Sequence, residues 1–291
     1  MPVQRIVSIL VNVTLIQLMV TIGLGVTLRQ VAAVAANGRL VATAAIANYL
    51  LVPACAAALL LLFKAPPLVS AGLLITAVCP GAPYGPPFTA LAKGDVAVSV
   101  GLMALLAASS AVVSPLLLKA ALPIVANDQA VTIDVLQMDG TLIVTQLLPL
   151  AAGVAIGAWR PELADRLAGP SKRVSLILNL ATVGLIVVVQ HKLLLDIRPM
   201  AYAGMLALTL ASVGAGWALG GGCAGRRVAM AFSTGVRNVG VSLVIATASF
   251  PGTAAVTAAL AYALFQTFVL AALAFVWGRL AGRDVNSRTA S

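Results

Sequence analysis

Apolar stretches long enough to cross a lipid bilayer follow one another along almost the whole chain. A membrane-spanning helix needs about 20 predominantly apolar residues. Backbone polar groups in lipid must find partners within the protein, so such stretches fold as helices. We therefore predict an all-α polytopic membrane protein. Its nine predicted transmembrane helices are Ile6–Leu28, Leu40–Phe63, Leu68–Leu91, Val96–Leu118, Leu142–Trp159, Val174–Gln190, Met200–Leu219, Val228–Ala248 and Thr253–Trp277.

Composition agrees with a membrane protein and argues against other classes. Charged residues make up 9% of the chain, whereas soluble domains carry about 25%. The net charge of +10 comes from basic residues scattered over short loops, so we expect no nucleic-acid binding. The three cysteines form no CxxC or Cys/His cluster, so no metal site, disulfide framework or cofactor is predicted.

Basic residues are distributed unequally between the two sides of the membrane. Cytoplasmic loops carry an excess of Lys and Arg, so we predict a multi-pass protein of the plasma or inner membrane with its N-terminus outside and its C-terminus in the cytoplasm. The first apolar stretch is longer than the 7–15 residues of a signal peptide's apolar region, so we expect it to be retained. The outer side would carry Arg5, Lys64, Lys119, Lys192 and Arg198, and the other side twelve basic residues, among them Arg29, Arg160, Lys172 and Arg226.

The third and eighth stretches are interrupted where a continuous helix is expected. The third contains Pro80, Pro83, Pro86 and Pro87 with Gly81 and Gly85, and proline breaks a helix interior. Backbone outside a helix is tolerated at membrane depth only in protein or beside a cavity. The two stretches lie five spans apart and run in opposite directions, which indicates an inverted repeat whose broken helices cross at a central site. The expected substrate and crossover residues are Pro83, Tyr84, Gly85, Pro86, Thr89, Arg237, Asn238 and Gly240.

Several motifs resemble the bile acid/sodium symporter (BASS) family. They are Cys79-Pro80-Gly81, the run LAKGDVAVSV at 91–100, GVRNVG at 235–240, and NYLLVP at 48–53. The resemblance implies a core domain that contains the crossing helices, a panel domain, and substrate in the crevice between them, with alternating access. The implied organisation is panel helix 1–35, core 36–125 with the broken helix 68–91, external connection 126–140, panel 141–195, core 196–280 with the broken helix 228–248, and cytoplasmic tail 281–291.

The positions that match the family's sodium ligands carry other residues here. Sodium-coupled members have Ser-Asn where this chain has Gly85-Pro86, and a Glu and a Gln where it has Ser233 and Arg237. All eight acidic residues lie in loops or at span ends, so no carboxylate would neutralise a sodium ion within the membrane. We predict weak or absent sodium coupling, with Arg237 in place of the ions. The complete set of matching positions is Asn48, Gly85, Pro86, Ser99, Met103, Ser233, Thr234, Val236 and Arg237.

Several of these residues have a structural and a functional interpretation. Arg237 would donate to free carbonyl groups at the helix breaks, or bind an anionic substrate group; both are compatible with its five donors. Asn238 would cap the second half-helix or contact substrate. Tyr84 would pack, or close the crevice. Cys79 would be a small apolar residue, or a soft ligand for a metalloid.

The functional prediction is a facilitative or secondary active transporter of organic anions that are bile-acid-like, keto acids or pantoate-like. The alternatives are a sodium-coupled symporter with degenerate ion sites, and a non-transporting receptor or scaffold. The spans contain no Ser/His/Asp, Cys/His or paired-carboxylate set, so no enzyme is predicted. The expected partners are a small organic anion and the lipid bilayer, and the oligomeric state is left open.

Overall fold

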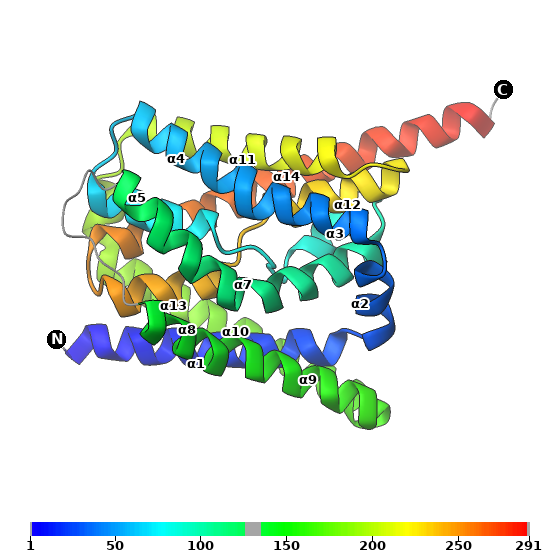
Figure 1. The fold of residues 1–291 in the computed structure, drawn as a ribbon, viewed down its shortest axis with the longest axis horizontal. Coiled ribbons are helices and arrows are strands. Elements are labelled where there is room, and N and C mark those ends of the chain that lie inside the picture. The colour runs from blue at the N-terminus through cyan, green and yellow to red at the C-terminus, as the bar shows by residue number, and fades with distance from the viewer. Residues whose placement is uncertain (1, 126–134, 290–291) are drawn as a thin grey trace.

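The computed structural model describes residues 2–125 and 135–289, and these residues form helices and connecting turns without a strand (Figure 1). In chain order the elements are α1 (Pro2–Gly25), α2 (Leu28–Ala35), α3 (Gly38–Ala45), η1 (Ile46–Leu51), α4 (Val52–Leu62), α5 (Pro67–Ala77), α6 (Gly85–Leu91), α7 (Val96–Val125), α8 (Val135–Leu142), η2 (Ile143–Leu147), α9 (Leu148–Trp159), α10 (Pro161–Leu195), α11 (Pro199–Leu219), α12 (Ala224–Gly235), α13 (Val239–Ser249) and α14 (Ala254–Thr289).

Eight helical segments among the described residues are long and apolar enough to cross a membrane. One of them, Ala224–Ser249, contains the second helix break. The third predicted span forms two short helices, α5 and α6, neither of which is long enough to span the bilayer alone. The all-α polytopic fold is therefore confirmed, whereas the count of nine spans and the inverted repeat remain predictions.

Several element boundaries differ from the sequence-based expectation. The predicted external connection 126–140 is helical from Val135 onward, and its first part lies outside the described residues. The sixth span is longer than predicted, because α10 starts at Pro161, where proline suits the first turn of a helix. The predicted tail 281–291 continues α14 as far as Thr289. A separate helix α2 follows α1, because Thr27 and Gln30 form a capping box that starts a new helix.

Helices α1, α9 and α10 pack on one another along one side of the molecule (lower part of Figure 1). They are the helices predicted to form the panel. Hydroxyl groups join α1 to α10: Thr14 and Thr182 lie 2.6 Å apart, and Thr21 lies 2.6 Å from Ser171. Hydrogen bonds between hydroxyl groups are a common way to join helices where lipid removes the hydrophobic drive. These three helices form one layer, and whether it moves as a domain remains a prediction.

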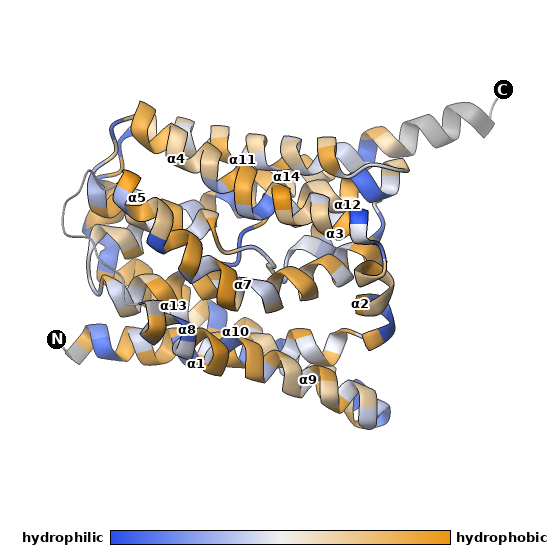
Figure 2. Ribbon diagram, viewed as in Figure 1, coloured by the Kyte–Doolittle hydropathy of each residue, from blue (hydrophilic) through white to orange (hydrophobic). Residues whose placement is uncertain are grey.

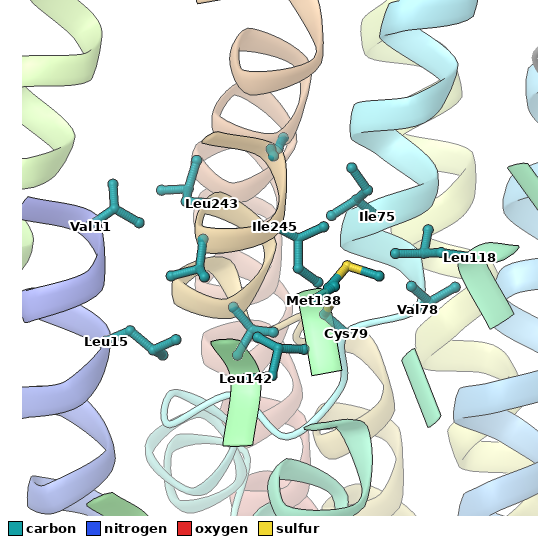
Figure 3. Close-up of a cluster of buried hydrophobic side chains, with 14 of the residues drawn as sticks. Val11, Leu15, Ile75, Val78, Cys79, Leu118, Met138, Leu142, Leu243 and Ile245 are labelled. Atoms are coloured by element: carbon teal, nitrogen blue, oxygen red, sulfur yellow. The ribbon is translucent and has the colours of Figure 1, made fainter. Parts of the chain in front are cut away.

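Buried side chains fill the space between this layer and the other helices. Figure 3 shows Val11 and Leu15 of α1 facing Leu243 and Ile245 of α13, with Ile75 of α5 beyond them. Figure 2 shows apolar residues along most of the helices, and large apolar side chains such as Leu62 and Phe268 are mostly exposed on the outside. An apolar exterior is the surface that a bilayer requires.

Candidate crossover site and cavity

The two helix breaks meet in the interior of the protein. Helix α5 ends at Ala77 and α12 ends at Gly235. The backbone N–H of Asn238 donates to the carbonyl oxygen of Cys79 at 2.7 Å, and Asn238 Nδ2 donates to the Gly81 oxygen at 3.2 Å. The non-helical backbone of each break therefore supplies partners for the other, as membrane depth requires.

Asn238 also starts the second half-helix. Its Oδ1 accepts a hydrogen bond from the N–H of Val241 at 3.3 Å, so the side chain caps α13. The side chain is fully buried, and both of its polar atoms have protein partners. The capping interpretation of Asn238 agrees with this geometry. Its neighbour Gly240 lies in the first turn of α13 against Leu15 of α1.

Gly81 allows the first break to lie against α7. Its φ is +81°, and a Cβ there would lie 2.2 Å from the backbone nitrogen of Ala107. A side chain is therefore excluded by conformation and by space. The sequence marks this glycine only as one of two in a proline-rich stretch, and its close neighbour is 26 residues away in the chain.

Arg237 is completely buried where the two breaks meet. Its Nη1 donates to the carbonyl oxygen of Ala77, the last residue of α5, at 3.1 Å. Its Nη2 donates to Asn48 Oδ1 at 2.8 Å and to the carbonyl oxygen of Thr234 near the end of α12. The guanidinium thus binds carbonyl groups that the ends of two half-helices leave free. This arrangement matches the structural interpretation of Arg237.

Gln266 and the π-helical turn that carries Asn48 also hold Arg237 in place. Gln266 of α14 accepts from the Arg237 N–H at 3.2 Å and donates to the Arg237 carbonyl oxygen at 3.3 Å. Asn48 lies in the π-helical turn η1 and donates to Thr234 Oγ1 at 3.2 Å. Such π turns often occur at functional sites. Gln266 had a weak signal, as an amide in the middle of an apolar stretch.

Ser99 and Ser233, two of the positions that match sodium ligands, form a connected set of hydroxyl groups with the predicted crossover residue Thr89. Thr89 Oγ1 donates to Ser99 Oγ, which lies 3.1 Å from Ser233 Oγ. All three side chains are buried. Within the part of the chain that the structure describes, no three His, Cys, Asp or Glu residues gather as a metal site would require. Among the described residues, the hydrogen bonds of these three hydroxyl groups join them only to one another and to no carboxylate, whereas a buried cation is normally paired with a negative charge.

A cavity of about 370 Å³ lies between α1, α7, α10 and the first break. Of the predicted site residues, it brings together Pro83, Tyr84 and Pro86 with Met103 of α7. Thr89, Gly85, Arg237, Asn238 and Gly240 do not line it. The cavity thus lies between the first break, which is part of the predicted core, and α1 and α10 of the predicted panel. The resemblance implies a substrate crevice between these two domains.

Lys172 of α10 supplies a positive charge to this cavity, together with the hydroxyl groups of Ser175 and Thr21. Leu18, Ile22 and Leu176 add apolar surface. Such a lining suits a ligand with one anionic group and an apolar body. In the sequence Lys172 lies two residues before an apolar stretch, a position that predicts only a charge in a loop.

Tyr84 joins the first break to α10. Its hydroxyl oxygen accepts a hydrogen bond from Asn179 Nδ2 at 3.0 Å, and the ring is 36% exposed at the edge of the cavity. Tyr84 thus links the first break to α10 at the edge of the cavity, and its role in packing or in closing the crevice stays a prediction. Cys79 is fully buried in the apolar interior (Figure 3), as its packing interpretation predicts.

The same layer of helices is closely packed at its opposite end. Thr257 of α14 donates to Gln190 of α10 at 3.0 Å. The neighbouring gap, between Gln4, Gln190 and Gly252, measures only about 10 Å³. The cavity beside the first break lies toward the other end, where Gly25 and Lys172 are exposed, which is the predicted cytoplasmic end.

Comparison with known proteins agrees with the motifs. The model of the sodium bile acid symporter family matches residues 12–197, which is more than half of the chain. The comparison with curated proteins found no significant match.

Proposed function

The chain belongs to the sodium bile acid symporter family and is therefore a membrane transporter, and we propose that it carries small amphipathic organic anions by alternating access, with weak or no sodium coupling. The observation that carries the proposal is the completely buried Arg237, bonded to carbonyl groups at both helix breaks. A fixed cation there does electrostatically what bound sodium would do, and it repels further cations.

The cavity beside the first break supports an organic anion as substrate. Its volume of about 370 Å³ falls within the range of small-molecule sites. Lys172 would bind the anionic group, and the apolar side chains of α1 and α10 would cover the remainder. We propose keto acids, pantoate-like acids and bile-acid-like compounds as the classes to test, with Arg237 acting through the fold of the crossing rather than by contact with substrate.

Thermal melting in detergent tests the sodium part of the proposal. The wild-type protein is melted in sodium, and in potassium or choline at matched ionic strength. A ligand present at 100 times its Kd stabilises a protein by about 2.7 kcal/mol, which a melting curve detects. We expect no sodium-specific shift for the wild-type protein and a shift for the double variant Arg237→Gln/Ser233→Glu, which restores a carboxylate and removes the fixed charge.

A sodium-specific shift of the wild-type protein would overturn the proposed lack of coupling and favour a symporter with degenerate sites. A double variant that melts cooperatively but does not respond to sodium would contradict the proposed exchange of Arg237 for ions.

Transport into proteoliposomes tests the substrate part. Exchange of radiolabelled organic anions is measured for wild type, Lys172→Gln and the matched control Arg173→Gln. A lost charge-assisted hydrogen bond should raise KM roughly tenfold in Lys172→Gln and leave the control unchanged. Exchange that is equal in both variants would remove Lys172 from the site. No exchange of any anion would favour a receptor or scaffold.

A further inference from the structure

Another cavity, lined by two arginines and by apolar residues, lies at the predicted cytoplasmic end, away from the crossover. It measures about 310 Å³ and is bounded by α2, α3, α7 and α12. Two arginines line it from different elements: Arg29 belongs to α2, and Arg226 belongs to the first turn of α12. These elements are far apart in the chain, so the tertiary fold creates the concentration of positive charge.

Hydrogen-bond donors without partners add to this charge. Gln30 Oε1 accepts a hydrogen bond from Thr27, and Asn37 Oδ1 caps α3. The amide nitrogens of the same two side chains, Gln30 Nε2 and Asn37 Nδ2, remain free to donate. Among the residues that the structure describes, no carboxylate forms an ion pair with Arg29 or Arg226, and neither amide nitrogen has a partner. The carboxylate of Asp95, just beyond the cavity, accepts from the N–H of Val98 at the start of α7.

The next residue in the chain, Arg227, does not line the cavity and has other partners. Arg227 lies over the ring of Trp217, with 3.4 Å between its guanidinium carbon and the ring centroid, and its Nε donates to the Trp217 oxygen. Arg226 instead lies beside Gly222, where a Cβ would be only 2.9 Å from Arg226 Nη1. Of two consecutive arginines, one is fixed by an aromatic ring and the other faces the cavity.

We propose that this cavity binds a phosphate group through Arg29 and Arg226, with Gln30 and Asn37 as neutral donors. Arginine binds phosphate oxygens in pairs through its planar fork of N–H groups. The phosphate has two possible sources, the headgroup of an anionic phospholipid in the cytoplasmic leaflet and a soluble phosphate. Basic pockets between transmembrane helices on that side commonly bind lipid headgroups. The bound group holds α2, which continues from the predicted panel helix α1, against α12 of the predicted core.

Melting of delipidated protein in detergent tests the proposal without any transport assay. The probes are phosphatidylglycerol against phosphatidylcholine, and inorganic phosphate against chloride at matched ionic strength. The variants are Arg29→Gln/Arg226→Gln and the charge-matched control Arg160→Gln/Arg166→Gln, whose residues are exposed at the same end. We expect wild type and control to be stabilised, and the apparent Kd of the Arg29/Arg226 variant to rise at least about tenfold.

A shift with phosphatidylglycerol alone assigns the site to a lipid headgroup, and a shift with inorganic phosphate as well assigns it to soluble phosphates; both support phosphate binding. No shift of the wild-type protein with either probe would overturn the proposal. An equal loss in both double variants would also overturn it, because the effect would then come from total charge. If the double variant does not melt cooperatively, Arg226→Gln alone is compared with Arg166→Gln.

Discussion

A guanidinium near the bilayer centre costs about 2.5–3.5 kcal/mol on insertion scales, and the contacts of Arg237 offset that cost. Its Nη atoms bind the carbonyl oxygens of Ala77 and Thr234 together with Asn48 Oδ1. Those carbonyl groups would themselves lack partners at the ends of their helices. The buried charge therefore satisfies carbonyl groups at both helix breaks, and these groups in turn offset the cost of burying the charge.

Asn238 permits a direct test of the link between the two breaks. Asn238→Ala removes both the cap of α13 and the hydrogen bond to Gly81. We expect a loss of about 1–3 kcal/mol of stability, measured by thermal melting in detergent. Asn238→Ser keeps a capping oxygen and should lose less. Equal melting temperatures for wild type and Asn238→Ala would contradict this role.

Gly81 is the position where the backbone of the first break has least freedom to change. Gly81→Ala should lower the melting temperature by several degrees, because its φ is positive and its Cβ would overlap the backbone of Ala107. The control is Gly214→Ala in α11, where nothing lies within 4 Å. The control should melt at or slightly above the wild-type temperature, since alanine favours helix. Similar melting of both variants would show that α7 moves aside.

At the scale of elements, the contact between α1 and α9 depends on the absence of side chains. A Cβ on Gly153 would lie 2.5 Å from the oxygen of Val20 and 2.8 Å from the Cα of Gly23. Small residues at helix interfaces in membranes let backbones approach closely. Helix α1 is joined to α10 by a different means, a hydrogen bond between the hydroxyl groups of Thr21 and Ser175, which lie 2.7 Å apart.

Two glycines of α9 make a matched pair for testing this contact. Gly153→Ala should separate α1 from α9 and lower the melting temperature by several degrees. Gly157→Ala has only one neighbour, the Val26 oxygen at 4.0 Å, and should be neutral. The two variants carry the same chemical change in one helix, so equal melting would exclude backbone contact as the cause.

At the scale of the whole molecule, cavities open at opposite ends. One lies beside Gly25 and Lys172, and another, of about 490 Å³, lies between α4, α5, α11 and α14 with Ala254 at its edge. The predicted topology places Gly25 toward the cytoplasm and Ala254 toward the outside. Labelling of residues in each cavity from each side of the membrane therefore tests the topology, and it also tests the side to which the crevice opens.

Labelling with a membrane-impermeant thiol reagent makes this test. Gly25→Cys and Ala254→Cys are each introduced where Cys55, Cys79 and Cys223 are replaced by alanine. We expect Gly25→Cys to react in inside-out vesicles and Ala254→Cys to react in right-side-out vesicles. Each variant is the other's control. The reverse pattern would invert the predicted topology, and reaction of Gly25→Cys from both sides would indicate a crevice that also opens outward.

The apolar stretches and their two interruptions determined most of the fold from the sequence. Stretches of about 20 apolar residues must be helices in lipid, because no other backbone conformation satisfies its own polar groups. The prolines of Pro80–Pro87 likewise excluded a continuous third helix. Those constraints act locally along the chain, and so the all-α fold and the position of the breaks are readable without knowledge of contacts.

Only the tertiary structure decided which polar groups meet. In the sequence Arg237 is a lone charge whose partners are either helix carbonyl groups, the favoured interpretation, or an anionic substrate group. The fold surrounds it with Ala77, Asn48 and Thr234. The sequence predicts Lys172 to be a charge in a loop, whereas the packing of α10 on α1 places it in a cavity. Arg29 and Arg226 are almost 200 residues apart in sequence. Contacts of this kind depend on how the helices pack against one another in three dimensions. The pattern of apolar and polar residues within a single helix carries no information about that packing.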